Sequence, residues 1–75
     1  MSALSEQVAA IAVGYLGPAA RVFLERQTKS HLNGLAFSDL EKQHLPELQK
    51  WVLISSGLLI DKAKAKEFSD RVGAL

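Results

Sequence analysis

The chain has 75 residues, a formal net charge of +1 and no cysteine. A chain of this length corresponds to one domain, residues 1–75, whose core supplies about 3–5 kcal/mol of net stability unless something reinforces it. The absence of cysteine excludes disulfides and thiolate metal sites, and the nearly balanced charge gives little long-range attraction to DNA or to acidic membranes.

The apolar segment near the start of the chain is too short to cross a membrane. It runs over the nine uncharged residues 8–16, whereas a helix that spans a bilayer needs about 20. A signal peptide begins with basic residues, but the first basic residue here is Arg21. We therefore expect a cytoplasmic protein that does not associate with a membrane.

The first predicted helix contains this apolar segment and begins after Ser2 or Ser5, either of which is a suitable N-cap. Gly17 and Pro18 predict a break or a sharp kink at its end, because glycine permits a helix to stop and proline is tolerated in the first turn of the next helix. The apolar side chains recur at the spacing of one helix face: Leu4, Val8, Ile11, Ala12 and Tyr15.

A second helix is predicted from about Pro18 to His31. Glu25 and Lys29 lie four residues apart on it, in the order that favours an ion pair. Asn33 and Gly34 then predict a turn.

The segment after this turn contains a predicted capping box and a helix that begins at a proline. Ser38 and Glu41 have the capping-box spacing. Because the residue before a proline avoids the helical region, we expect a short turn over residues 39–44, a helix from Pro46 to about Ser56 and a stop at Gly57. One apolar stripe of this segment holds Leu45, Leu48, Val52 and Leu59, and an adjacent stripe holds Trp51, Ile54 and Leu58. Together the stripes predict a helix that is covered on more than one side.

The last predicted helix runs from about Lys62 to Val72, with Asp61 as its N-cap and Gly73 at its end. These segments predict an all-α fold, either a small four-helix bundle or an orthogonal helical domain. The expected core residues are Phe23, Leu24, Leu48, Trp51, Val52, Phe68 and Val72.

Two short motifs resemble those of a known family. Residues 15–20 read YLGPAA, and Glu67 and Phe68 begin a later segment, EFSDRV. They resemble a small helical module of unknown biochemical activity at the C-terminal ends of many bacterial signalling proteins, whose motif reads YIGPIA. The chain departs from that family at Ala19, where the motif has isoleucine, and at residues 25–27, where basic residues are commoner. The resemblance implies a regulatory or interaction appendage.

No residue pattern indicates catalysis, a cofactor or a metal. The histidines, His31 and His44, do not have the HxxxH or HExxH spacing of zinc sites. Residues 55–57, Ser-Ser-Gly, lack the strand that precedes a nucleophile elbow. Asp39 and Glu41 are two residues apart and do not face the same side of a helix. We therefore predict a non-enzymatic protein without a cofactor or a metal.

The scarcity of charge in the first helix is the main functional indication. A small domain covers one side of such a helix, and an apolar patch that stays uncovered usually marks an interaction surface. We expect this surface to bind another protein or a second copy of the chain. It comprises Val8, Ala9, Ala12, Val13 and Leu16.

The alternative function is that of a small helical DNA-binding domain. The second and last predicted helices carry most of the basic residues, and helical domains of this size often bind DNA. Acidic residues are interspersed among these basic ones, however, and the net charge of +1 falls short of a strongly basic nucleic-acid footprint. We therefore favour a protein partner over a nucleic acid.

Overall fold

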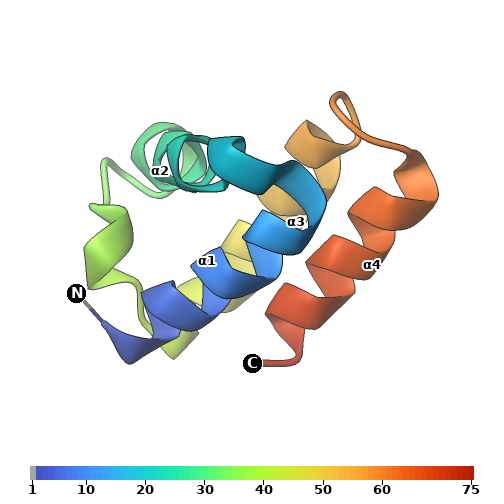
Figure 1. Ribbon diagram of the computed structural model, residues 1–75. Coiled ribbons are helices and arrows are strands. Elements are labelled where there is room, and N and C mark those ends of the chain that lie inside the picture. The colour runs from blue at the N-terminus through green and yellow to red at the C-terminus, as the bar shows by residue number, and fades with distance from the viewer. Residues whose placement is uncertain (1) are drawn as a thin grey trace.

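The computed structural model describes residues 2–75, and these residues form helices, turns and connecting segments with no strand (Figure 1). The longer elements are α1 (Ala3–Leu16), α2 (Ala20–His31), α3 (Leu45–Ser56) and α4 (Lys62–Gly73). Single 3-10 turns precede α2 and α3: η1 (Gly17–Ala19), η2 (Phe37–Asp39) and η3 (Lys42–His44). The prediction of an all-α fold is confirmed.

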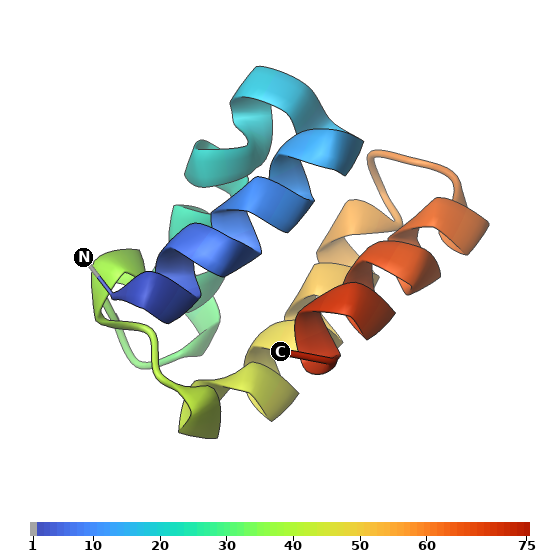
Figure 2. The ribbon, with the colours of Figure 1, turned by 60° about the horizontal axis from the view of Figure 1, so that its bottom comes forward.

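The helices enclose one hydrophobic core. α1 packs against α2 and α4, and α3 packs against the same two helices. Figure 1 shows α2 nearly end-on while the other helices lie obliquely across the page, so α2 crosses them. Figure 2 shows α3 and α4 side by side.

The predicted break at Gly17 and Pro18 is present. α1 ends at Leu16, and Gly17 has φ 59° and ψ −137°, a conformation that is almost restricted to glycine. Pro18 lies in the first turn of η1, where the lack of an N–H costs nothing. The chain therefore changes direction within three residues, and α2 crosses the other helices (Figure 2).

Replacing Gly17 with alanine is expected to destabilise the protein by about 1–3 kcal/mol, because alanine is strained at this φ and ψ. Gly14→Ala is the matched control. Gly14 lies inside α1, and apart from its chain neighbours and the nearby helix backbone no atom lies within 4 Å of the Cβ that alanine would add. This change should therefore stabilise the helix by up to about 1 kcal/mol. Urea unfolding followed by circular dichroism measures both. Equal effects of the two changes would contradict the strained turn.

The bend at Gly17 also divides an apolar helical run that would otherwise be long enough to cross a membrane. Residues Ala3–His31 together form a helical run that is long and apolar enough to cross a membrane by length and composition. The run is not straight, however, since η1 separates α1 from α2. α1 has 14 residues and is therefore about 21 Å long, which is less than the hydrocarbon thickness of about 30 Å. Neither straight helix is long enough to span a bilayer by itself.

One turn and two helix N-caps also lie where the sequence predicts them. Asn33 and Gly34 have φ angles of 56° and 75°, and they form the turn after α2. The Ser2 side chain caps α1 by accepting a backbone N–H of the first turn at 3.0 Å. Asp61 caps α4, where its Oδ1 accepts the N–H of Ala63 at 3.0 Å. The helix starts after Ser2 and Asp61 are thus well predicted by the sequence.

The predicted capping box of Ser38 and Glu41 is wrong. Ser38 lies inside η2 and so does not precede a helix. The capping box instead joins Glu41 to His44, whose Nδ1 accepts the backbone N–H of Glu41 at 2.9 Å. It begins η3, which leads into α3 at Leu45, next to the predicted start.

Six of the seven predicted core residues are buried. Phe68 is completely buried, and its ring packs against those of Tyr15 and Phe23 at centroid distances of 5.1 and 6.2 Å. These contacts join α4 to both α1 and α2. Phe68 is therefore the aromatic centre of the core.

Trp51, the seventh predicted core residue, is only half-buried. Its ring stacks flat on that of His31, with 3.7 Å between centroids, and its Nε1 donates to Glu47 Oε2 at 3.1 Å. Leu48 and Val52 occupy the buried side of α3 instead. The core assignment of Trp51 is wrong because the apolar arc of α3 is wider than the part that other helices cover.

Candidate interaction surface

The surface predicted on α1 lies largely inside the protein. Val8, Ala9 and Ala12 are buried because α1 packs between α2 and α4. Leu16 is half-buried at the end of the helix, and Val13 is 57% exposed. The prediction of one exposed surface formed by these five residues is therefore wrong, since three of them belong to the core.

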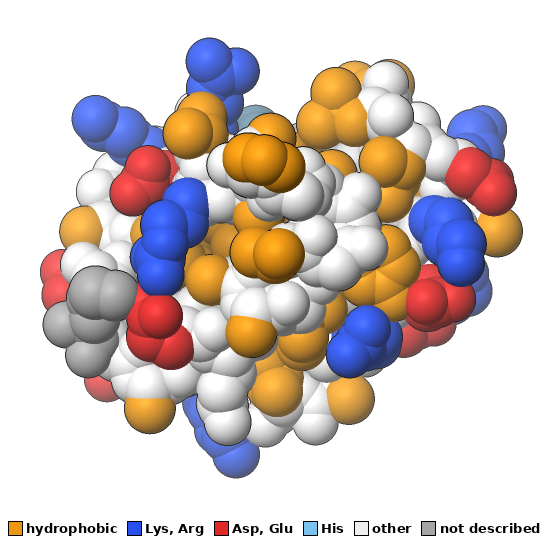
Figure 3. Space-filling view, viewed as in Figure 1, with side chains coloured by type: hydrophobic (Ala, Val, Ile, Leu, Met, Phe, Trp, Pro, Cys, Tyr) orange, Lys and Arg blue, Asp and Glu red, His pale blue; other side chains and the backbone are white. Residues whose placement is uncertain are grey.

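A different apolar surface lies at the C-terminal end of α3 and on its connection to α4. Figure 3 shows hydrophobic side chains gathered over this end of α3. We call the following residues the α3–α4 apolar surface: Leu53 (41% exposed), Ile54 (49%), Leu58 (85%) and Leu59 (65%). Aliphatic side chains at such exposure add little to the hydrophobic stabilisation of the chain itself.

The helical repeat explains why these residues face outward. Successive residues of a helix are rotated by about 100°. Because Leu48 and Val52 point into the core, Leu53 and Ile54 point away from it. Ile54 belongs to the second apolar stripe of the sequence, whereas Leu53 belongs to neither stripe, so the stripes indicate this surface only in part. The expectation of a helix that is covered on more than one side does not hold at Ile54, which is exposed.

A groove of about 390 Å³ adjoins this surface, between α3 and α4. The lining is aliphatic apart from two lysines, and it comprises Leu53, Ile54, Gly57, Leu58, Lys62, Ala65 and Lys66. The groove therefore combines apolar walls with a positively charged edge on α4.

The charges around this groove are unevenly balanced. Lys66 forms an ion pair with Asp70 at 3.2 Å, and both side chains are largely exposed. Within residues 2–75, no carboxylate lies within ion-pair distance of Lys62. The side chain of Asp61 is engaged with the first turn of α4. Lys62 is thus the cation of the groove with no partner among the described residues.

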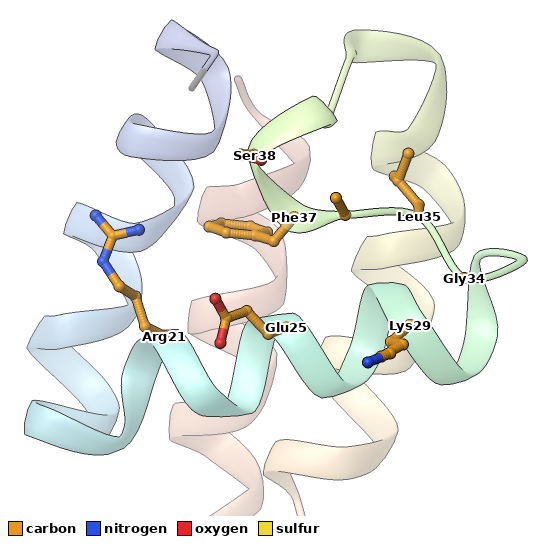
Figure 4. Close-up of a pocket in the computed structure, with 8 residues that line it drawn as sticks. Arg21, Glu25, Lys29, Gly34, Leu35, Phe37 and Ser38 are labelled. Carbon is orange, nitrogen blue, oxygen red and sulfur yellow. The ribbon is translucent and has the colours of Figure 1, made fainter.

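A second hollow, of about 490 Å³, lies between α2 and residues 34–38 (Figure 4). Arg21, Glu25 and Lys29 line it along one side of α2. Glu6 holds Arg21, with its carboxylate oxygens 2.9 and 3.0 Å from Nη2. The predicted ion pair between Glu25 and Lys29 is not among those that residues 2–75 form. The mixed charges of this hollow are typical of a solvated helix face.

Tyr15 connects α1 to α4 through a polar and aromatic cluster. Its ring stacks on Phe68 with an interplanar angle of 12°, and its hydroxyl donates to Glu67 Oε1. Arg71 Nη1 donates to the same hydroxyl at 3.4 Å, and the hydrogen bond with Tyr15 raises the pKa of Arg71. The two motifs of the family resemblance therefore meet in space, and their contact holds two helices together.

The described residues show no arrangement suited to a metal. Within residues 2–75, no group of three or more His, Cys, Asp or Glu side chains is placed to hold a metal ion. His31 stacks on Trp51, and His44 belongs to the capping box before α3. Both histidines thus have structural contacts.

Comparison with known proteins finds no match to the chain. No protein-family model matches the chain, and neither the curated proteins nor the solved structures yield a match.

Proposed function

We propose that the chain is a non-enzymatic protein-interaction module and that the α3–α4 apolar surface is its contact site. The observation that supports this proposal is the exposure of several large aliphatic side chains at one end of a domain whose core forms without them. A contiguous exposed apolar patch commonly marks a site where a protein binds. The partner is another protein or a second copy of the chain.

The proposal also covers the arrangement of the helices and the role of the protein in the cell. We treat the scaffold as a small four-helix bundle in which α1 and α2 are separate helices. The resemblance of residues 15–20 and of Glu67 and Phe68 to modules of bacterial signalling proteins supports a regulatory role in the cytoplasm.

DNA binding, the alternative function, has less support from the charges. Arg21 is paired with Glu6, and Lys66 is paired with Asp70. Two of the cations available for phosphate contacts therefore already have acidic neighbours. Binding to arbitrary duplex DNA with a steep dependence on salt would favour this alternative.

Site-specific photo-cross-linking in the cell that makes the protein tests the proposed contact. A benzophenone amino acid in place of Leu58 is expected to give a discrete protein adduct, because Leu58 is the most exposed member of the surface. The same amino acid in place of Glu25, exposed on α2, is the matched control and should give no such adduct.

A second substitution ties the adduct to the surface. Ile54→Lys should remove the adduct from position 58, because an unpaired charge in an apolar contact is costly. The thermal melting curve should change little, since Ile54 is half-exposed. Equal adducts from positions 58 and 25, or an adduct at 58 that survives Ile54→Lys, would contradict the proposal. The mass of the adduct distinguishes a second copy from another protein.

A further inference from the structure

We infer that the groove between α3 and α4 binds an amphipathic helix of a partner protein, with acidic residues beside the apolar side of that helix. This inference rests on the proposed function and specifies the chemistry of the partner. It follows from the shape of the groove, the chemistry of its walls and the sign of its charges.

The walls of the groove favour a helical occupant. An extended peptide usually adds to the edge of a sheet, and proline-rich segments bind grooves lined by aromatic rings. Residues 2–75 contain no strand, and the groove walls are aliphatic, formed by residues such as Leu53, Ile54 and Ala65. Two neighbouring helices with such walls match the mode in which a third helix inserts apolar residues at helical spacing.

The charges of the groove indicate acidic residues on the partner. Lys62 and Lys66 are one helical turn apart and therefore lie on the same side of α4. No carboxylate belongs to the groove lining, and Asp70 neutralises Lys66 only in part because that pair is exposed. Asp or Glu at a one-turn spacing on a partner helix would complement both lysines and guide its association.

The same charges disfavour a second copy as the occupant. In a two-fold dimer an identical patch faces itself. The lysines of both copies would then meet around one apolar contact without a lining carboxylate to balance them. Like charges brought together in this way reduce affinity.

The shape of the site favours a protein helix over an acidic membrane. Interfacial binding to a bilayer uses an apolar face that inserts into the headgroup region. Here Leu53, Ile54 and Ala65 line a recess between two helices, and a row of protruding side chains fills such a recess better than a bilayer surface does.

Selection from a display library of randomised 16-residue peptides on the immobilised full chain tests the inference. We expect enriched peptides to carry apolar residues at positions i, i+3 or i+4, and i+7, with Asp or Glu alongside. In fluorescence anisotropy, the Lys62→Glu/Lys66→Glu variant should bind the best peptide about tenfold more weakly. Lys29→Glu, an exposed change on α2, should leave its affinity unchanged.

The possible outcomes separate this inference from the proposed function. Amphipathic peptides without acidic enrichment, or with equal affinity for the charge-reversed variant, would overturn the acidic partner and leave the interaction module intact. Peptides that still bind after Ile54→Lys would place the site elsewhere and contradict both. Failure to enrich amphipathic peptides would overturn the helical occupant. The helical occupant would also be overturned if the chain sedimented with phosphatidylserine-containing vesicles and the Leu58→Ser/Leu59→Ser variant did not.

Discussion

Replacing Phe68 with alanine is expected to leave about half of the molecules or more unfolded at room temperature. Phe68 is completely buried and packs against Tyr15 and Phe23. Removal of a buried phenylalanine ring costs about 3–5 kcal/mol, and the net stability of a domain this small is also about 3–5 kcal/mol. Far-UV circular dichroism at increasing temperature should show a weak transition or none.

The matched control is Leu58→Ala, which also removes a large apolar side chain. Leu58 is highly exposed, so its loss should change the free energy of unfolding by no more than about 0.5 kcal/mol. A Phe68→Ala protein that melts as the wild type does would show that the core does not depend on this ring.

Arginine at Ala9 is expected to prevent folding, whereas arginine at Val13 is expected to be tolerated. Ala9 is buried within the core cluster, and a long charged side chain there would be both overpacked and unpaired. Val13 lies one turn further along α1 and is mostly exposed. The two variants thus carry the same new side chain on the same helix in opposite environments.

Circular dichroism and one-dimensional proton NMR distinguish the folded from the unfolded variant. If Ala9→Arg retained a dispersed NMR spectrum, that side of α1 would be accessible, and the originally predicted surface on α1 would regain support. If Val13→Arg unfolded, the exposed side of α1 would have a structural role that its contacts do not indicate.

Local features of the fold are the ones that the sequence predicts well. Gly17 and Pro18 end one helix, Asn33 and Gly34 form a turn, and Asp61 caps α4. Each of these features depends on the backbone preferences of one or two residues. The rest of the fold has little influence on them.

The proposed contact surface depends on tertiary packing and is therefore harder to predict. α1 is apolar around much of its circumference, and α3 has two apolar stripes. Such patterns do not specify which side a neighbouring helix covers. In the structure, α2 and α4 cover Val8 and Ala12 on α1, whereas Ile54 on α3 remains half-exposed. The pattern of α1 therefore reflects burial, and the proposed contact surface lies on α3 instead.

The two segments that carry the resemblance meet through packing that their spacing in the sequence does not predict. Tyr15 and Glu67 are far apart in the sequence, yet the tyrosine hydroxyl donates to the glutamate and its ring stacks on Phe68. These residues join α1 to α4.

NMR titration tests whether a partner binds at the proposed α3–α4 apolar surface. The ¹⁵N-labelled chain would be titrated with the partner recovered from the cross-link at position 58. We expect the largest changes in backbone amide chemical shift to cluster over residues 53–66. A cluster of changes around Val13 on α1, with residues 53–66 unaffected, would contradict it.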